Sequence, residues 1–384
     1  MCYFSTLTDK YIIKMGDSMK LNNKKFILVL SQRDIKHPYK GGAEVYLHNA
    51  LKQISKKIPI VHLSAYHPKQ NVKEESIDNI YYIRRGKSLL SLTWEAIIFY
   101  FKNRDNIVAI IDHSNTHQFF TFIWARKKRV FFIHQLTLNI WPYFFGKILG
   151  FFLRIAEEIL IFLSRGTTIT VSNSTKKDLL ERHFKDVYIC PEGNYIRYES
   201  LPDNEKEDYF IYVGRLVPYK RVEDAILMAH HLKKKLYIVG RGKDKYVNKL
   251  KKLIKELGSD CEITGFLSVE EKEKLIKKAK LLIMPSIREG WGLVITESAN
   301  LGTPSLVYPV HGVIEAVNYG KAGFLAKDTS WHSLVDAYNK ITDKDYEKIR
   351  VAAFEYSKKF TWDKTAKEFE KIIKKILEKE GFKL

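Results

Sequence analysis

The sequence predicts an α/β protein built from two Rossmann-like domains that face a central cleft. Short, continuously apolar runs, typical of strands buried on both faces, alternate with segments of helical spacing. This alternation occurs twice, on either side of a polar, proline-containing stretch at 198–208. Consecutive βαβ units of this kind form parallel sheets covered by helices, so two series predict two such sheets.

The same signals divide the chain. The N-terminal extension has no strand pattern, and we expect either a disordered extension or, for residues 1–18, a misplaced start before Met19. The C-terminal helices are rich in Lys and Glu, and we expect them to pack back on the first domain. The predicted parts are the extension 1–23, an N-terminal domain 24–197, a linker 198–208, a second domain 209–358 and the C-terminal helices 359–384.

The elements of the first half follow from apolar runs that end in polar residues and from helical spacing. In 167–184 a strand is followed by Ser, Asn, Ser and Thr, which favour the start of a helix. We expect strands in 24–34, 59–66, 77–85, 107–114, 129–135, 167–171 and 186–194, and helices in 43–55, 94–103 and 172–184.

The second half repeats the pattern and closes with helices through residue 380. We expect strands in 209–216, 235–242, 261–267, 280–286, 303–310 and 323–328, and helices in 221–232, 246–257, 269–279, 292–301 and 314–320.

The most apolar segment is 141–164, "WPYFFGKILGFFLRIAEEILIFLS". It is long enough to span a bilayer, but Lys147, Arg154, Glu157 and Glu158 are costly at membrane depth, so we interpret it as a helix that does not cross a membrane. This helix and the basic charge would suit an anionic membrane surface. The alternative is a buried helix of the first domain, which the pattern slightly favours.

The chain carries 65 Lys and Arg against 44 Asp and Glu, a formal net charge of +21. Such an excess attracts nucleic acid, acidic membranes or phosphate-bearing substrates, although a lysine-rich genome also produces it. Three scattered cysteines are too few for a disulfide framework and, without a C-x-x-C pair, argue against a zinc site; the N-terminus lacks the apolar core of a signal peptide. We expect a cytoplasmic protein, with a peripheral place on the inner face of the cell membrane as the alternative.

The stretch 285–308, "PSIREGWGLVITESANLGTPSLVY", carries two acids with seven residues between them. Gly290 and Gly292 allow the backbone to turn after a strand, and a helix begins near Leu293, where free N–H groups favour a phosphate. Glu297 lies one turn into the helix and can accept hydrogen bonds from a diol, while Glu289 lies beyond the phosphate position. The alternative is a surface turn with two solvated acids.

Other strand ends carry glycine with cations or aromatic residues. Gly214 is followed by Arg215 and Lys220, which can stabilise a departing diphosphate. Backbone near Gly240 and Phe266 can line a nucleobase pocket. Glycines that serve only tight turns, and ordinary surface cations, give the same patterns.

In the first half, Gly41 and Gly42 separate a strand from a helix. They do not form G-x-G-x-x-G, which argues against a dinucleotide fold of the dehydrogenase type. His134 ends a strand and is expected to face the cleft, because ligands bind beyond the carboxyl ends of parallel strands. A lone histidine is more often structural than catalytic, but the position of His134 at a strand end favours the two interpretations about equally.

The segments "GRLVPYKR", "VGRG" and "EGWGLVITES", in this order and with "TVSNSTKKDLL" upstream, resemble the retaining glycosyltransferases of family 4, which have the GT-B fold. The resemblance extends from about residue 24 to 375. It implies that the C-terminal domain binds a nucleotide-sugar and the N-terminal domain an acceptor, either a glycan or a lipid-linked glycan.

The resemblance also implies roles for single residues. By this resemblance, Glu297 would bind the ribose, and Glu289 would contact hydroxyls of the transferred hexose. His134 would lie near the reacting sugar. The diphosphate would be stabilised by Arg215 and Lys220, with backbone at Gly292 and Leu293, and Gly42 would belong to a loop that closes on the donor. It implies retention of the anomeric configuration, no catalytic metal and no cofactor.

The chain departs from the family at several positions. Glu192 and Tyr195 replace a common Asn-Gly pattern, His311 replaces a glycine and Trp291 a more frequent phenylalanine. The rival functions are a sugar-nucleotide epimerase, a glycan synthase or phosphorylase of the same architecture, and a basic nucleic-acid-binding protein. No RNA-binding motif or zinc finger supports the last, so we expect no nucleic-acid partner.

Overall fold

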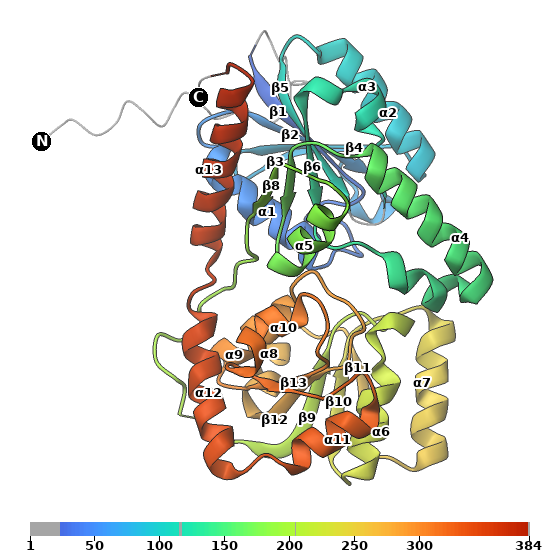
Figure 1. Cartoon of the computed structure of the whole chain (residues 1–384), viewed down its shortest axis with the longest axis vertical. Helices are drawn as coiled ribbons and strands as arrows, with labels where there is room; N and C mark the ends of the chain where they lie inside the picture. The colour runs from blue at the N-terminus through green and yellow to red at the C-terminus, as the bar shows by residue number, and fades with distance from the viewer. Residues whose placement is uncertain (1–23, 115–116, 204, 383–384) are drawn as a thin grey trace, which may run out of the picture.

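A computed structural model describes residues 24–114, 117–203 and 205–382. The predicted extension 1–23 lies outside the described residues. Figure 1 shows two α/β domains, one above the other, with the C-terminal helices along one side of both. The fold therefore has the two-domain organisation expected from the repeated strand and helix pattern.

The N-terminal domain holds an eight-stranded sheet in the order β3-β4-β2-β1-β5-β6-β7-β8. The central strand, β1, is completely buried, as its apolar run predicts. The strands are β1 (Phe26–Ser31), β2 (Ile60–Ala65), β3 (Glu74–Ile77), β4 (Ile80–Arg85), β5 (Ile107–Ser114), β6 (Arg129–Ile133), β7 (Thr168–Thr170) and β8 (Val187–Ile189). The helices are α1 (Gly42–Ile54), α2 (Leu89–Asn103), α3 (Thr121–Trp124), α4 (Trp141–Leu163) and α5 (Asn173–Glu181).

One edge of this sheet differs from the prediction. The single strand expected in 77–85 is the second arm of a hairpin, in which β3 pairs antiparallel with β4. Asp78 and Asn79 form its turn with φ of 51° and 63°, the backbone that two-residue hairpin loops require. The sheet is therefore parallel except at this edge.

The C-terminal domain holds a six-stranded parallel sheet in the order β11-β10-β9-β12-β13-β14. Its strands are β9 (Glu207–Val213), β10 (Lys235–Val239), β11 (Cys261–Gly265), β12 (Ala279–Met284), β13 (Ser305–Val307) and β14 (Phe324–Leu325). Its helices are α6 (Val222–His231), α7 (Asp244–Leu257), α8 (Val269–Lys278), α9 (Leu293–Asn300), α10 (Val313–Ala316), α11 (Trp331–Asn339) and α12 (Asp343–Ser357).

The last helix, α13 (Trp362–Lys379), returns to the N-terminal domain. In Figure 1 it lies beside that domain while α12 lies beside the other. Thr365 Oγ1 donates to the carbonyl of Pro191 at 2.9 Å, and Lys57 on the chain after α1 pairs with Glu370. Two chain segments thus join the domains, one before β9 and one between α12 and α13.

The interpretation of 141–164 as a buried helix is wrong. Within α4 only Gly150 and Ile161 are buried, and most of its large apolar side chains are exposed. The helix turns a sharp corner at Gly146, whose φ of 77° is non-helical, so its residues cannot all face the domain core. No helix in the described part of the chain is long and apolar enough to cross a membrane.

Candidate functional site

The loops that follow the carboxyl ends of the two sheets meet between the domains, where Gly42 faces Leu293 and Gly290 faces His134, and we call this region the cleft. In the first sheet the strand order reverses between β1 and β5, and in the second between β9 and β12. Ligands of such sheets bind outside the strand ends at these reversals. The loops that follow these four strands carry most of the predicted site residues, so the topology brings the two halves of the predicted site together.

The N-terminus of α9 faces the N-terminal domain. Gly292 precedes the helix with φ of 101°, a backbone that suits glycine, and offers no side chain to cap the first N–H groups. Across the cleft, a Cβ added to Gly42 would lie 2.9 Å from Leu293 Cδ1. The starts of α1 and α9 therefore approach each other closely, and their N–H dipoles favour an anion between the domains.

Two cations lie beside this helix end. Lys220, in the 3₁₀ helix η4 (Pro218–Lys220), forms an ion pair with the buried carboxylate of Glu289. Arg215 Nη2 donates to Tyr219 Oη at 3.2 Å. The nearby Tyr219, Glu289 and Glu44 raise the pKa of Arg215, so its guanidinium stays protonated. A positive pair next to a helix N-terminus can stabilise a diphosphate.

Glu297 lies one turn into α9, as predicted. Its Oε2 atom receives an ion pair from Lys272 of α8 at 2.9 Å, and both side chains are partly exposed. The Lys272 ammonium therefore orients this carboxylate while leaving lone pairs for further donors. The arrangement can hold a diol.

The predicted base pocket lies at neighbouring strand ends. Gly214 follows β9 and donates its N–H to Val239 at 3.0 Å. A Cβ on Gly240 would lie only 1.8 Å from the Gly214 carbonyl oxygen, so this position requires glycine for close packing. Phe266 is 68% exposed, with the Arg241 guanidinium 4.5 Å from its ring centroid. This exposed ring offers a flat apolar surface near the strand ends.

His134 is not isolated. Its Nδ1 lies 3.0 Å from Glu192 Oε1, and its Nε2 lies 2.9 Å from His113 Nε2, all three side chains being buried. Burial and the neighbouring His134 hold the pKa of His113 well below its usual value, so His113 is neutral at pH 7. A Cβ on Gly290 would meet the His134 carbonyl oxygen at 2.8 Å, which places this group directly against the opposite loop.

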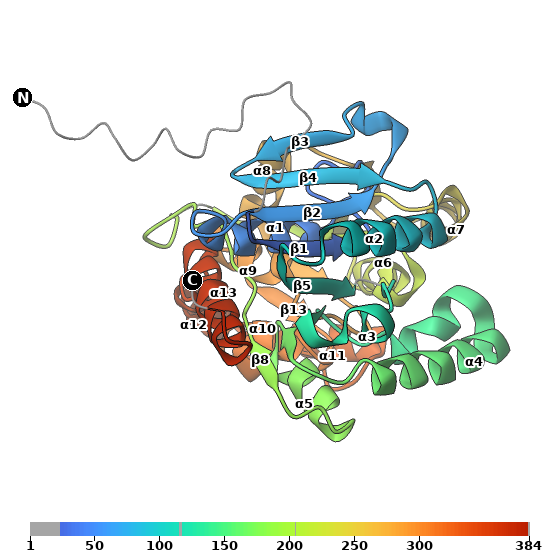
Figure 2. The same cartoon turned by 90° about the horizontal axis from the view of Figure 1, so that it is seen from above.

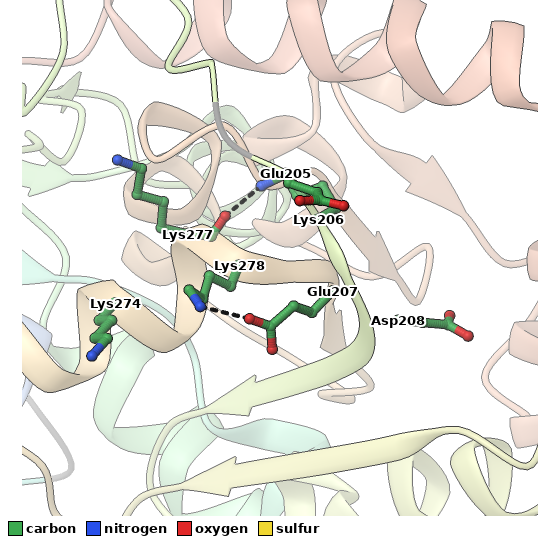
Figure 3. A pocket seen from close by; sticks show the side chains of 7 residues that line it. All are labelled: Glu205, Lys206, Glu207, Asp208, Lys274, Lys277 and Lys278. Atoms are coloured by element: carbon green, nitrogen blue, oxygen red, sulfur yellow. Dashed lines mark hydrogen bonds and ion pairs between the residues drawn. The ribbon is translucent and has the colours of Figure 1, made fainter.

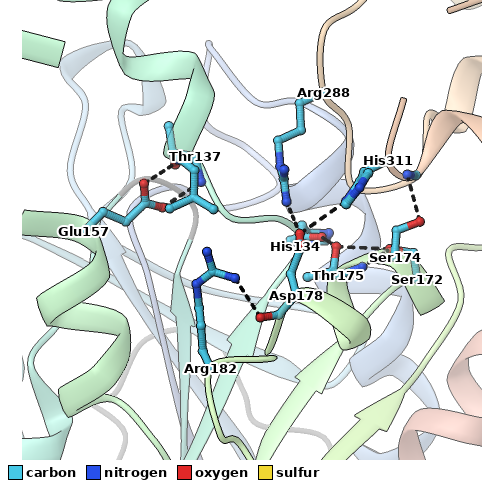
Figure 4. A network of polar contacts seen from close by, with 12 residues as sticks. His134, Thr137, Glu157, Ser172, Ser174, Thr175, Asp178, Arg182, Arg288 and His311 are labelled. Atoms are coloured by element: carbon cyan, nitrogen blue, oxygen red, sulfur yellow. Dashed lines mark hydrogen bonds and ion pairs between the residues drawn. The ribbon is translucent and has the colours of Figure 1, made fainter. Parts of the chain in front are cut away.

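The domains are tied by polar contacts around α5 (Figure 4). Asp178 forms an ion pair with Arg288 of the other domain, and its Oδ2 lies 3.4 Å from His311 Nδ1. Glu315 of α10 accepts the backbone N–H groups of Asn173 and Ser174, at 2.9 and 2.6 Å. His311, one of the departures from the family pattern, thus lies at a contact between the domains. The carboxylate of Glu315, in the C-terminal domain, caps the start of α5 in the N-terminal domain.

Four side chains that contact the predicted site residues or join the domains were absent from the predicted set or were noted only as departures: Glu44, His113, Glu192 and Glu315. Glu44 is buried, accepts the N–H of Gly41 and lies 3.0 Å from Arg33 Nε. Its position three residues after the glycine is the spacing of a capping box, a signal available in the sequence. Trp291, another departure, is buried with its ring 4.8 Å from that of Phe360.

Two pockets lie away from the cleft. One, of about 650 Å³, is lined by charged residues at the start of β9 and the end of α8, at the amino ends of the strands (Figure 3). The other, of about 520 Å³, lies between α1, the β3–β4 turn and the start of α13. Since ligands of parallel sheets bind at the carboxyl ends, the cleft remains the candidate site. In the described residues, no three His, Cys, Asp or Glu side chains gather as a metal site requires.

Comparisons with known proteins agree on one class. Residues 197–360 match the family model "Glycosyl transferases group 1". An uncharacterized glycosyltransferase of Methanocaldococcus jannaschii is 23% identical over 365 residues, covering 91% of this chain and 99% of the relative. Over 47% of this chain and 52% of the relative, a lipopolysaccharide 1,2-N-acetylglucosaminetransferase of Salmonella typhimurium is 28% identical.

Solved structures share the fold over nearly the whole chain. Sucrose-phosphate synthase from Thermosynechococcus elongatus aligns with a TM-score of 0.76 and 16% identity, covering 93% of this chain and all of that one. HepE of Anabaena, solved in complex with UDP-glucose, aligns with a TM-score of 0.72 and 18% identity over 90% of this chain and 98% of that one. They confirm the predicted arrangement of two Rossmann-like domains.

Proposed function

We propose that this chain is a group 1 glycosyltransferase that transfers a hexose from a nucleotide-sugar to a glycan or lipid-linked acceptor, with retention of the anomeric configuration. The family model, the relatives and the shared GT-B fold support this proposal. The observation that carries the proposal is the grouping of Arg215, Lys220 and Glu289 beside the uncapped start of α9.

The donor is held by the C-terminal domain. The diphosphate lies against the N–H groups of Gly292 and Leu293, with the two cations beside it. Glu297 accepts the ribose hydroxyls, and the nucleobase lies near Gly240 and Phe266. The crystal structure of HepE in complex with UDP-glucose supports this class of donor.

The cations perform the electrostatic work of the reaction. As the bond between C1 of the sugar and the phosphate oxygen breaks, its electron pair passes to the diphosphate. Lys220 and Arg215 stabilise that charge from fixed positions, which lowers the barrier without a metal ion. The Lys220 ammonium pairs with Glu289 in the structure, so donor binding places this ion pair between sugar and diphosphate.

Retention follows from departure and attack on one face of the sugar. The acceptor oxygen bonds to C1 on the face that the diphosphate leaves, and its proton passes to a diphosphate oxygen. Glu289 binds hydroxyls of the transferred sugar, and His134 lies near the same ring, held by Glu192. We propose no covalent glycosyl-enzyme intermediate.

An assay with a panel of UDP, GDP and ADP sugars tests the proposal. Release of the nucleoside diphosphate is measured with and without EDTA, and NMR reads the anomeric configuration of the product. We expect one donor series to be consumed, with activity unchanged by EDTA and the donor configuration preserved. An inverted product, or activity that requires an added divalent metal, would contradict the proposed mechanism.

A further inference from the structure

The outward face of α4 is a continuous apolar stripe. Ile148, Phe152, Ile155, Ile159 and Phe162 recur at intervals of four and three residues, which places them on one side of a helix. All five are exposed, Ile148 by 79% and Phe152 by 61%. Single exposed apolar residues are common on protein surfaces, but a row of this length marks an interaction site.

A helix corner enlarges this stripe. At Gly146 the chain turns back, and a Cβ on Gly150 would lie 2.6 Å from Pro142, so the two arms of the corner are in contact. Phe144 and Phe145, on the short arm of this corner, are also exposed. Figures 1 and 2 both show this end of α4 extending beyond the rest of the molecule.

The charges of α4 are sorted by face. Lys147 and Arg154, seven residues apart, are exposed along one flank of the stripe. Glu157 points inward and accepts the N–H groups of Thr137 and Leu138, each at 2.6 Å. Glu158 pairs with Arg182, at 2.7 Å. The carboxylates of this helix are therefore engaged by the protein, and its outward side offers apolar groups and positive charge.

From this sorting we infer that the outward face of α4 docks on an anionic lipid bilayer. An apolar helix face lies at the boundary of headgroups and acyl chains, and flanking cations attract anionic headgroups. The net charge of +21 adds long-range attraction to such a surface. A second protein would need a complementary apolar face, whereas a bilayer accepts a projecting row of side chains without one.

The docking face adjoins the candidate site. The ring of Phe144 lies 5.8 Å from that of Tyr219, which directly precedes Lys220. The bilayer surface is therefore separated from the loop of the diphosphate cations by one pair of aromatic rings. This placement indicates a lipid-linked acceptor, which the membrane presents next to the cleft. The inference about the acceptor rests on the proposed function.

Flotation of the full chain with vesicles tests the inference. Vesicles of phosphatidylcholine, with or without about 30% phosphatidylglycerol, are compared at low and high salt. We expect binding to the anionic vesicles only, weakened by salt. The variant Ile148→Asp/Phe152→Asp should lower the partition coefficient by roughly tenfold or more, because two anchoring side chains are lost and two negative charges added.

A matched control carries the same charge change elsewhere. Val269→Asp/Val351→Asp alters two exposed valines of the C-terminal domain and should bind vesicles like the wild type, after allowance for net charge. Retained thermal stabilisation by the donor nucleotide shows that a variant is folded and that its donor site is intact. Absence of wild-type flotation, equal binding by the α4 variant, or a dimer that the α4 variant dissociates would overturn the inference. Vesicle binding without any response to nucleotide would instead count against the proposed function.

Discussion

Lys220 and Glu289 form the ion pair on which the proposed chemistry depends. Both side chains are almost completely buried, so the pair lies in a region of low dielectric where charges interact strongly. Replacing Lys220 with methionine keeps most of the volume and removes the charge that stabilises the leaving diphosphate. We expect kcat to fall on the order of 10²-fold, the usual effect of deleting one such donor.

Steady-state kinetics of Lys220→Met and of a control, Lys249→Met, measure this effect. Lys249 is an exposed cation of α7 that pairs with Glu223, so its loss should leave kcat within twofold, roughly the scatter expected for a surface pair. Equal kcat values for Lys220→Met and wild type would remove Lys220 from the mechanism.

Glu192 positions a buried histidine. Because its carboxylate accepts from His134 Nδ1, Glu192→Ala leaves that ring nitrogen without its partner inside the protein. We expect the free energy of unfolding to fall by about 1–3 kcal/mol, the cost of an unsatisfied buried polar group. Urea denaturation measures it, with the exposed Glu199→Ala as the control that should change little. Equal stability of the two variants would show that the contact contributes nothing.

At the residue scale, local spacing in the sequence predicted the candidate site residues. Contacts between residues far apart in the sequence could not be predicted in this way. The spacing of Glu289 and Glu297 and the cations after Gly214 predicted side chains that the fold brings to one cleft. The contact of His134 with Glu192 joins residues 58 positions apart, and no local pattern indicates such a pairing. The predicted roles of these residues remain predictions that the kinetics above address.

At the scale of elements, the contact between α10 and α5 joins the two domains. Glu315 accepts two backbone N–H groups at the start of α5 and bonds with the side chains of Asn173 and Ser174. Glu315→Ala removes these charge-assisted bonds and the favourable interaction with the helix dipole. We expect a loss of about 1.5–3 kcal/mol and a more open arrangement of the domains.

Small-angle scattering and thermal unfolding test this expectation together. The variant should show a larger radius of gyration than the wild type, whereas Glu262→Ala, which breaks only a long surface pair with Lys235, should not. An unchanged radius of gyration and melting temperature in Glu315→Ala would mean that other contacts hold the cleft closed.

Most elements could be predicted because buried strands and amphipathic helices carry clear periodic patterns. The hairpin of β3 and β4 was missed because Glu74 to Ile77 is a short edge strand without an apolar run. The exposure of α4 was missed for a different reason. Apolar content predicts burial only when the element has something to pack against, and the corner at Gly146 directs this helix away from the core.

At the scale of the whole molecule, buried histidines make folding sensitive to acid. Burial lowers the pKa of His62 to about 4, and it holds that of His113 well below the usual value near 6.5. Between those values the unfolded chain binds protons that the native state does not, so stability is full above pH 6.5 and is lost as the pH falls through this window. We expect a loss on the order of several kcal/mol by pH 5.

Thermal unfolding at pH 7.5 and 5.0 checks the sign and the size of this effect. The melting temperature should fall at pH 5.0, and His62→Asn should show a smaller fall than the wild type, since it lacks one of the groups that must be charged on unfolding. A wild-type melting temperature that does not change between the two values would contradict the assignment of these histidines as buried and neutral.

Binding of nucleoside diphosphates to the start of α9 is the central claim, and thermal shift measurements on wild type and Glu297→Gln test it most directly. At 100 times its dissociation constant, the correct nucleotide or its sugar should stabilise the wild type by about 2.7 kcal/mol. The variant, which keeps its shape but loses the carboxylate expected to hold the ribose, should lose most of that stabilisation. A folded wild type that responds to none of UDP, GDP, ADP and their sugars, or a variant that responds equally, would contradict the account.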